Sequence, residues 1–284
     1  MWVAALCCCL ATAAAPAQVP SVRLTPAEVV AGSPELVRVN APGAQAVAGE
    51  WAGRMLAFFR GREGAWYALA GTDVEAAAGP SPLHIATQTR VGKADLNLTV
   101  EVHEAHYRTE SLSVEPEFVQ PGPEALARIE AEKALKEKIF ASSAAEPLWS
   151  GDFRRPVAAR ATDSFGVRRT FNGKLESVHK GMDFRAATGT KVRAGNSGVV
   201  VLARRLYYEG NCVAIDHGMG LYTISMHLSR IDVREGQRVN ADDVVGLSGA
   251  TGRATGPHLH WAVRWRDAYL DPAKLLGMDL SKVR

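Results

Sequence analysis

The most informative segment of the C-terminal half is TGRATGPHLHW, Thr251–Trp261. In it, a Gly- and Thr-rich loop leads into an apolar strand. Residues two apart in a strand point to the same face, so we expect His258 and His260 to share one site while Leu259 enters the opposite layer. Imidazole is the commonest metal-binding side chain. A single His-x-His pair also occurs on many half-exposed strands, so its interpretation depends on the rest of the chain.

A second motif, HKGMD, occupies His179–Asp183 and places an acid four residues after a histidine. In a straight strand the two side chains would lie about 13 Å apart, too far for one metal ion. A helix would make them neighbours, but Gly181 and the turn-rich segment Phe171–Lys174 argue against a helix. A bend at Gly181 would let both reach one ion. Two histidines and one aspartate then form a three-ligand site, and zinc sites with three protein ligands and one open position are the catalytic kind.

A third histidine, His227, stands at the end of an apolar, β-branched run, YTISMHLS. The three pieces together resemble the lysostaphin/LytM-type zinc endopeptidases of peptidase family M23. The resemblance covers roughly residues 156–272 and includes the SFGVR segment Ser164–Arg168 and the turn Thr255–Pro257. It implies a twisted antiparallel sheet with a zinc-containing groove.

The resemblance also implies a role for each histidine. His179, Asp183 and His260 would bind zinc (Zn²⁺), and the fourth position would hold water. His227 and His258 would be the non-ligand histidines that orient or deprotonate this water and stabilise the oxyanion, with the division of tasks left open. Zinc–imidazole bonds are about 2.0–2.1 Å long, so a ring two residues along reaches the bound water more readily than the metal.

The activity implied is that of an exported zinc metalloendopeptidase that hydrolyses peptide cross-links of bacterial peptidoglycan. The alternative is a non-catalytic activator of cell-wall amidases that uses the same groove for binding. Non-catalytic members typically lack one or more ligands, whereas all five key positions are filled here, which favours the enzyme. One departure is Ser225, where the family often has a tyrosine two residues before His227. Either the enzyme does without this tyrosine, or Tyr222 substitutes for it.

The whole chain is predicted to be mainly β, with three parts. Residues 18–120 alternate short strands with turn clusters, which is typical of an immunoglobulin-like β-sandwich. Residues 124–141 carry apolar side chains on one half of a helical circumference and predict a linking helix within residues 121–148, although a flexible charged linker is the alternative. Residues 149–284 return to strands with Gly-rich turns and predict an antiparallel sheet.

The N-terminus predicts export. Val3–Ala15 is an uncharged run too short to span a membrane comfortably, and Ala15–Ala17 has the small-x-small pattern of a cleavage site. We therefore expect a signal peptide over residues 1–17 and a periplasmic or secreted protein with no stable membrane insertion after cleavage. Because Met1 and Trp2 supply no Lys or Arg, a buried N-terminal helix or an uncleaved anchor is the alternative.

Composition and cysteine usage add two expectations. The 284 residues carry a net charge of +3, which gives no case for a nucleic-acid partner. Three of the four cysteines would leave with the signal peptide, and Cys212 is predicted to be a small buried hydrophobe. His217, in the turn DHGMG, is interpreted as a structural residue. His103 and His106 are three apart on an apparent strand, so their rings should face opposite ways. The oligomeric state is left open.

Overall fold

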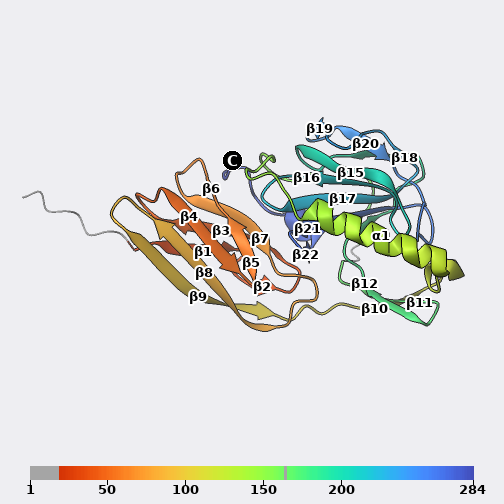
Figure 1. The fold of residues 1–284 in the computed structure, drawn as a ribbon, viewed down its shortest axis with the longest axis horizontal. Coiled ribbons are helices and arrows are strands. Elements are labelled where there is room, and N and C mark those ends of the chain that lie inside the picture. The colour runs from red at the N-terminus through yellow and green to blue at the C-terminus, as the bar shows by residue number, and fades with distance from the viewer. Residues whose placement is uncertain (1–18, 163–164) are drawn as a thin grey trace, which may run out of the picture.

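The computed structural model describes residues 19–162 and 165–284 and is mainly β, which confirms the predicted fold class. The predicted signal peptide, residues 1–17, lies outside the described residues. Two sandwiched sheets form the N-terminal part, a helix crosses the C-terminal part, and a larger antiparallel sheet forms the centre of the C-terminal part (Figure 1).

The N-terminal part is built from two sheets that bury their facing side chains. The first has the order β1 (Ser21–Thr25), β3 (Pro34–Asn40), β7 (Trp66–Gly71) and β6 (Phe59–Arg60). The second has the order β2 (Val29–Val30), β9 (Lys93–His103), β8 (Gly79–Gln88), β4 (Ala46–Trp51) and β5 (Arg54–Ala57). Val37 and Val39 of the first sheet share a core with Trp51 and Ile85 of the second. The two-layer arrangement agrees with the predicted sandwich, and its immunoglobulin-like connectivity remains a prediction.

A connecting segment then runs along the C-terminal part. It contains β10 (Thr109–Leu112), the short helix η1 (Pro116–Phe118) and α1 (Pro123–Phe140), which begins one residue before the predicted segment. Proline at the first helical position fits because its missing N–H has no partner there in any case. The helix packs through Ile139 and Phe140 near its C-terminal end, whereas Leu126 is 51% exposed. The segment is therefore a helix rather than a flexible linker, and it is anchored at one end of its apolar face.

The C-terminal part centres on a seven-stranded sheet. Its order is β13 (Met182–Phe184), β21 (Leu259–Trp265), β17 (Leu221–Leu228), β16 (Gly210–Asp216), β15 (Gly198–Leu206) and β19 (Arg238–Val239), with β22 (Ala268–Leu270) paired to β21. A three-stranded sheet of β14 (Lys191–Arg193), β20 (Val244–Leu247) and β18 (Arg230–Ile231) flanks it. β11 (Arg168–Phe171) pairs with β10 in parallel and with β12 (Leu175–Val178) in antiparallel fashion. The short helix α2 (Pro272–Leu276) follows the last strand.

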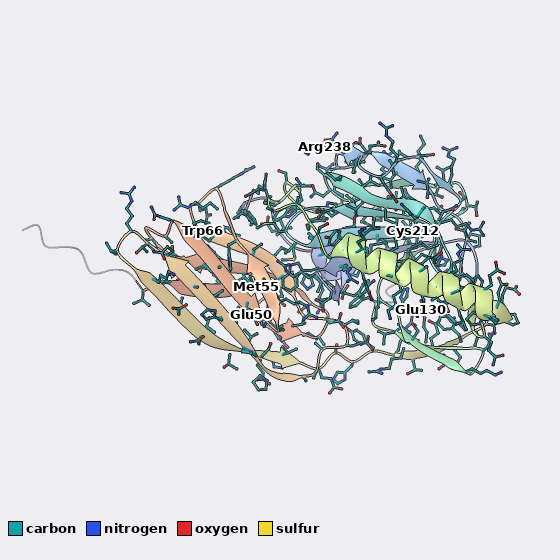
Figure 2. All side chains as sticks on the ribbon, in the orientation of Figure 1. Glu50, Met55, Trp66, Glu130, Cys212 and Arg238 are labelled. Atoms are coloured by element: carbon teal, nitrogen blue, oxygen red, sulfur yellow. The ribbon has the colours of Figure 1, made fainter. Side chains whose placement is uncertain are left out.

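Alternation along β21 separates two layers. Trp261, Val263 and Trp265 enter the main core, whereas Ala262 belongs to a smaller cluster that packs against α1. Cys212 is buried in this smaller cluster, and Figure 2 places it close to α1, as expected for a small hydrophobe. His260 lies two residues before Ala262 on the same strand, so its side chain projects from the same face of the sheet.

The two halves of the molecule share one continuous core. The rings of Phe59 and Trp149 meet edge to face with centroids 5.7 Å apart. The backbone of Asp271 donates to the carbonyl of Gly32 at 2.7 Å, and the backbone of Tyr269 donates to Asp73 Oδ2 at 2.8 Å. A Cβ on Gly71 would lie 2.6 Å from the side chain of Leu270. The sandwich is therefore fitted closely against β22 and the start of α2.

Candidate metal centre and groove

The structure brings His179, Asp183 and His260 together at one point. Asp183 on β13 is directly opposite His260 on β21 in the antiparallel register. His179 Nε2 lies 2.8 Å from His260 Nδ1 and 3.1 Å from Asp183 Oδ1, and His260 Nδ1 lies 3.0 Å from the same oxygen. Among the described residues, these three are the only group of histidine, cysteine and acidic side chains whose donor atoms all converge within 4.8 Å.

Gly181 makes this approach possible: the chain bends at this residue, as predicted, without a positive φ. The residue precedes β13, and a Cβ placed on it would lie 2.4 Å from His260 Nε2. Any side chain at this position would therefore displace the ring of His260. The chain changes direction before β13 begins, so His179 and Asp183 meet as i and i+4 residues without a helix.

Burial and hydrogen bonding set the charge states of the centre. Burial lowers the pKa of His179 to about 4, and its hydrogen bond to Asp183 opposes this effect. Burial alone would raise the pKa of Asp183, but hydrogen bonds from His179 and His260 outweigh it and hold the pKa of this carboxyl well below its usual range. A neutral imidazole beside an ionised carboxylate is the protonation state that metal binding requires.

Two more histidines complete the centre, and backbone carbonyls fix their orientation. His227 Nδ1 lies 2.8 Å from the carbonyl oxygen of Thr251, and His258 Nδ1 lies 2.8 Å from that of Gly256. A carbonyl can only accept, so each Nδ1 carries a proton, and in the neutral ring Nε2 presents a lone pair. The two rings lie 4.9 Å apart, and His258 Nε2 is 3.9 Å from Asp183 Oδ1.

His227 is held in a strained backbone conformation. Its φ is 61°, in the left-handed region that non-glycine residues seldom adopt. Its backbone N–H donates to the carbonyl of Glu209 at 2.8 Å. Strain of this kind persists only where the surroundings hold the residue in place, and it is common at active sites. Burial, followed by the neighbouring His258 and His260, lowers the pKa of His227 to about 3, so the ring is neutral.

Arg169 contacts the centre through an ion pair with Asp183. Its Nη2 lies 2.9 Å from Asp183 Oδ2, the oxygen that does not face the histidine pair, and its Nε lies 3.9 Å from Glu110 Oε2. Glu110 is on β10, which pairs with the β11 strand of Arg169 in parallel. The connecting segment therefore contributes to the surroundings of the centre.

A groove of about 830 Å³ surrounds the centre, and its lining residues all come from residue 108 onward. Its walls are the connecting segment, the β11–β12 hairpin, the β15–β16 turn and the loop before β21. Cations outnumber acids in this lining: it contains Arg108, Arg160, Arg169, Lys180, Arg185 and Arg253 against Glu110, Asp183 and Glu209. The groove therefore has a positive character that suits an anionic ligand.

Other residues considered from the sequence lie elsewhere. His217 is fully buried, and its two ring nitrogens lie 2.8 Å from the Ser197 carbonyl and 2.8 Å from Thr223 Oγ1, in keeping with a structural role. The suggestion that Tyr222 replaces the missing tyrosine is wrong, because Tyr222 is fully buried outside the groove lining and its hydroxyl donates to the carbonyl of Ser142, just after α1, at 2.7 Å. The tyrosine that lines the groove is Tyr208, which sequence reasoning missed.

Comparison with known proteins identifies the family of one segment of the chain. Residues 177–272 match the profile described as peptidase family M23. This segment is a peptidase family M23 domain. The M23 domain includes all five histidine and aspartate positions considered above and confirms the resemblance seen in the sequence.

Curated relatives match about two fifths of this chain. The chain is 45% identical over 111 residues to peptidoglycan DD-endopeptidase ShyA of Vibrio cholerae, which covers 38% of this chain and 26% of that protein. It is 37% identical over 119 residues to DD-carboxypeptidase/endopeptidase Mpg of Neisseria meningitidis, which covers 42% and 27%. The chain thus matches about a quarter of the length of these relatives.

One solved structure is similar to this protein over both halves of the chain. A crystal structure of a protein from Pseudomonas aeruginosa described as a peptidase M23 aligns with a TM-score of 0.68 and 29% identity, and it covers 88% of this chain and 96% of that chain. The N-terminal sheets and the M23 domain therefore occur together in a second protein. In the described part of our chain, no helix combines the length and the apolar character needed to cross a membrane.

Proposed function

We propose that this protein is an exported zinc metalloendopeptidase that hydrolyses peptide cross-links of bacterial peptidoglycan. The observation that carries the proposal is the convergence of His179, Asp183 and His260 beside two oriented histidines. The names of several relatives, which read peptidoglycan DD-endopeptidase, support the substrate class. We further propose the division into a signal peptide, a sandwich over residues 18–120, a linking helix over residues 121–148 and a peptidase domain over residues 149–284.

The donor set fits zinc. Three ligands at zinc–nitrogen and zinc–oxygen distances of about 2.0–2.2 Å in a tetrahedron are separated from one another by about 3.3–3.5 Å. The three donor atoms here are 2.8–3.1 Å apart, so small adjustments would accommodate the ion. Zinc at such a site supplies a water of lowered pKa and polarises the scissile carbonyl.

The chain's own residues handle the protons. In the neutral form, each of His227 and His258 presents Nε2 as an acceptor, because the proton on Nδ1 is committed to a carbonyl. Either Nε2 can take a proton from the attacking water, and once protonated it becomes a donor to the leaving amine. The positively charged groove would hold the acidic peptide in place, and Arg169 would keep the carboxylate of Asp183 oriented toward the metal.

Digestion of purified peptidoglycan tests the function. We expect cross-linked fragments to become monomers by hydrolysis within the bridging peptide, with new amino groups and no new reducing ends in the mass spectra of soluble products. A chelator should stop the reaction, and zinc at low concentration should restore it. If the zinc-loaded protein leaves cross-links intact but stimulates an amidase added to the same tube, it is an amidase activator instead.

Export is tested separately. N-terminal sequencing of the protein from its native host should find a mature chain that begins near Gln18 in the periplasm or the medium. An intact Met1 on cytoplasmic protein would contradict both the signal peptide and the proposed location.

A further inference from the structure

We propose that Arg253 forms a carboxylate-binding subsite in the groove and recognises a free carboxylate of the peptide substrate. The inference rests on the proposed function, because it concerns the ligand of the same groove. It adds a specificity-determining residue, which binds the substrate away from the zinc ligands and the two proton-transfer histidines.

The guanidinium of Arg253 is held between two aromatic rings. Its Cζ lies 4.5 Å from the ring centroid of Phe171 and 4.6 Å from that of Tyr208. All three residues line the groove. Phe171 is at the end of β11 and Tyr208 is in the turn between β15 and β16, so two separate walls of the groove hold this one side chain.

The loop that carries Arg253 is itself fixed. The backbone N–H of Arg253 donates to the carbonyl of Tyr208 at 2.8 Å. A Cβ on the preceding Gly252 would lie 2.3 Å from the backbone nitrogen of Gly210, so the loop packs directly on the β15–β16 turn. Little conformational entropy remains to be lost when Arg253 binds a ligand, which favours affinity.

In the part of the chain that the structure describes, Arg253 has no anionic partner. The acids near it are engaged by other residues: Glu209 pairs with Lys136, and Asp183 and Glu110 pair with Arg169. Among the side chains that the structure describes, no carboxylate forms an ion pair with Arg253, and no acceptor receives a hydrogen bond from its guanidinium. The two rings interact with the faces of the guanidinium, but they do not satisfy the N–H groups at its edge.

A carboxylate is the group that completes such a site. The planar N–H fork of arginine matches the two oxygens of a carboxylate, and the resulting charge-assisted bonds are stronger than neutral ones. Partial burial lowers the pKa of Arg253 from its usual value and removes part of its water, which makes an incoming anion more favourable. Peptidoglycan peptides carry free carboxylates on side groups and at chain ends, so the proposed substrate offers a fitting partner.

The test compares matched substrates. A synthetic cross-linked peptide is prepared with all its carboxylates free, and again with each carboxylate converted in turn to a carboxamide. For wild-type protein we expect one of these conversions to lower kcat/KM by about 10- to 100-fold, the range that hydrogen bonds to a charged group support.

In Arg253→Met, which keeps a long side chain between the rings, the same conversion should change kcat/KM less than about twofold. Arg253→Lys, which keeps the charge but loses the fork, should be intermediate.

Arg264→Met is the matched control. Arg264 also lies over two aromatic rings, with Cζ 4.7 Å from the centroid of Phe140 and 5.2 Å from that of Tyr269, but its Nε donates to the carbonyl of Arg266, and it is not among the groove-lining residues. We expect it to keep the wild-type preference. If Arg253→Met lowers the turnover of free and amidated substrates equally, Arg253 only stabilises the loop and the subsite is refuted.

A binding measurement separates this inference from the proposed function. If wild-type protein cleaves none of the peptides, the proposed function fails, and calorimetric titration with the intact peptides still decides the subsite. Tighter binding of the carboxylate form by wild-type protein, lost in Arg253→Met and kept in Arg264→Met, supports the subsite. Equal binding of both forms by wild-type protein overturns it.

Discussion

At the scale of single residues, Asp183 connects the parts of the centre. One of its oxygens faces His179 and His260, and the other accepts from Arg169. Because both of its oxygens are held, this carboxylate has one orientation available. Its ligand atom is therefore already in position for a metal ion. His227 and His258 are oriented separately, by backbone carbonyls, so in the proposed mechanism metal binding and proton transfer would depend on different side chains.

This separation predicts different outcomes for substitutions within the centre. His179→Ala, Asp183→Ala or His260→Ala should each weaken zinc binding by orders of magnitude, because each removes a ligand. His227→Ala should retain zinc and lose peptidoglycan hydrolysis. Metal analysis of the purified variants alongside turnover checks the assignment. It would be wrong if His227→Ala lost zinc as fully as His260→Ala.

Arg169 should influence the metal without touching it. Arg169→Met removes the donor to Asp183 Oδ2, and we expect zinc affinity to fall about 10- to 100-fold, as for other residues that orient a ligand. Competition with a chromophoric chelator measures this. Arg204→Met is the control, since Arg204 is an exposed arginine paired with Glu235 outside the groove lining. Equal zinc affinities for the two variants would show that Arg169 has no positioning role.

At the scale of elements, the ring of His217 links neighbouring strands of the central sheet through hydrogen bonds. It follows β16, and its ring bridges the Ser197 carbonyl just before β15 and Thr223 on β17. Phe153 meets the same ring edge to face at 5.1 Å. Because both ring nitrogens are used inside the fold, His217 stabilises the sheet rather than serving as a ligand.

Burial of His217 predicts a specific pH dependence of stability. Burial lowers its pKa from 6.5 to about 4, so the unfolded state binds more protons than the folded state between these values. Above pH 6.5 this group does not change the free energy of unfolding. As the pH falls from 6.5 to 4, the free energy of unfolding decreases, by up to about 3 kcal/mol in total. The free energy of unfolding from urea titrations at several pH values should fall less steeply with acid in His217→Gln than in wild type. Identical slopes would contradict the role of this histidine.

At the scale of the whole molecule, the sandwich and the peptidase domain behave as one packed body. Buried residues of both belong to one contiguous core, and Phe59 meets Trp149 across the junction. The described residues that line the groove all come from residue 108 onward. The sandwich thus supports the peptidase domain through its core, and the connecting segment reaches the groove.

A shared core predicts cooperative unfolding. Phe59→Ala should cost about 3–5 kcal/mol and lower the Tm of the single calorimetric transition, because the cavity would affect both halves. Met55→Ala, at a residue that is 55% exposed on the same half and labelled in Figure 2, should change stability by less than about 0.5 kcal/mol. Two separate transitions, only one of which moves in Phe59→Ala, would show that the halves unfold independently.

Much of this organisation could be predicted from local sequence patterns. Alternation and turn residues located the main strands, and the apolar face of residues 124–141 located α1 to within one residue. The order and spacing of the histidine motifs identified the family, because each motif lies within one or two elements. Leu126 is an exception, since it belongs to the predicted apolar face but is 51% exposed.

The sequence by itself determined the types of the elements and the set of side chains able to bind a metal. Only the tertiary structure decided that Asp183 pairs in register with His260, that Arg169 supports this carboxylate, and that Tyr208, rather than Tyr222, lines the groove. The physical reason is that propensity and periodicity act over a few neighbouring residues. Strand order and register, in contrast, are set by how the buried faces of distant segments fit together. Arg253 illustrates the difference, because the rings that hold it come from segments more than forty residues away in the sequence.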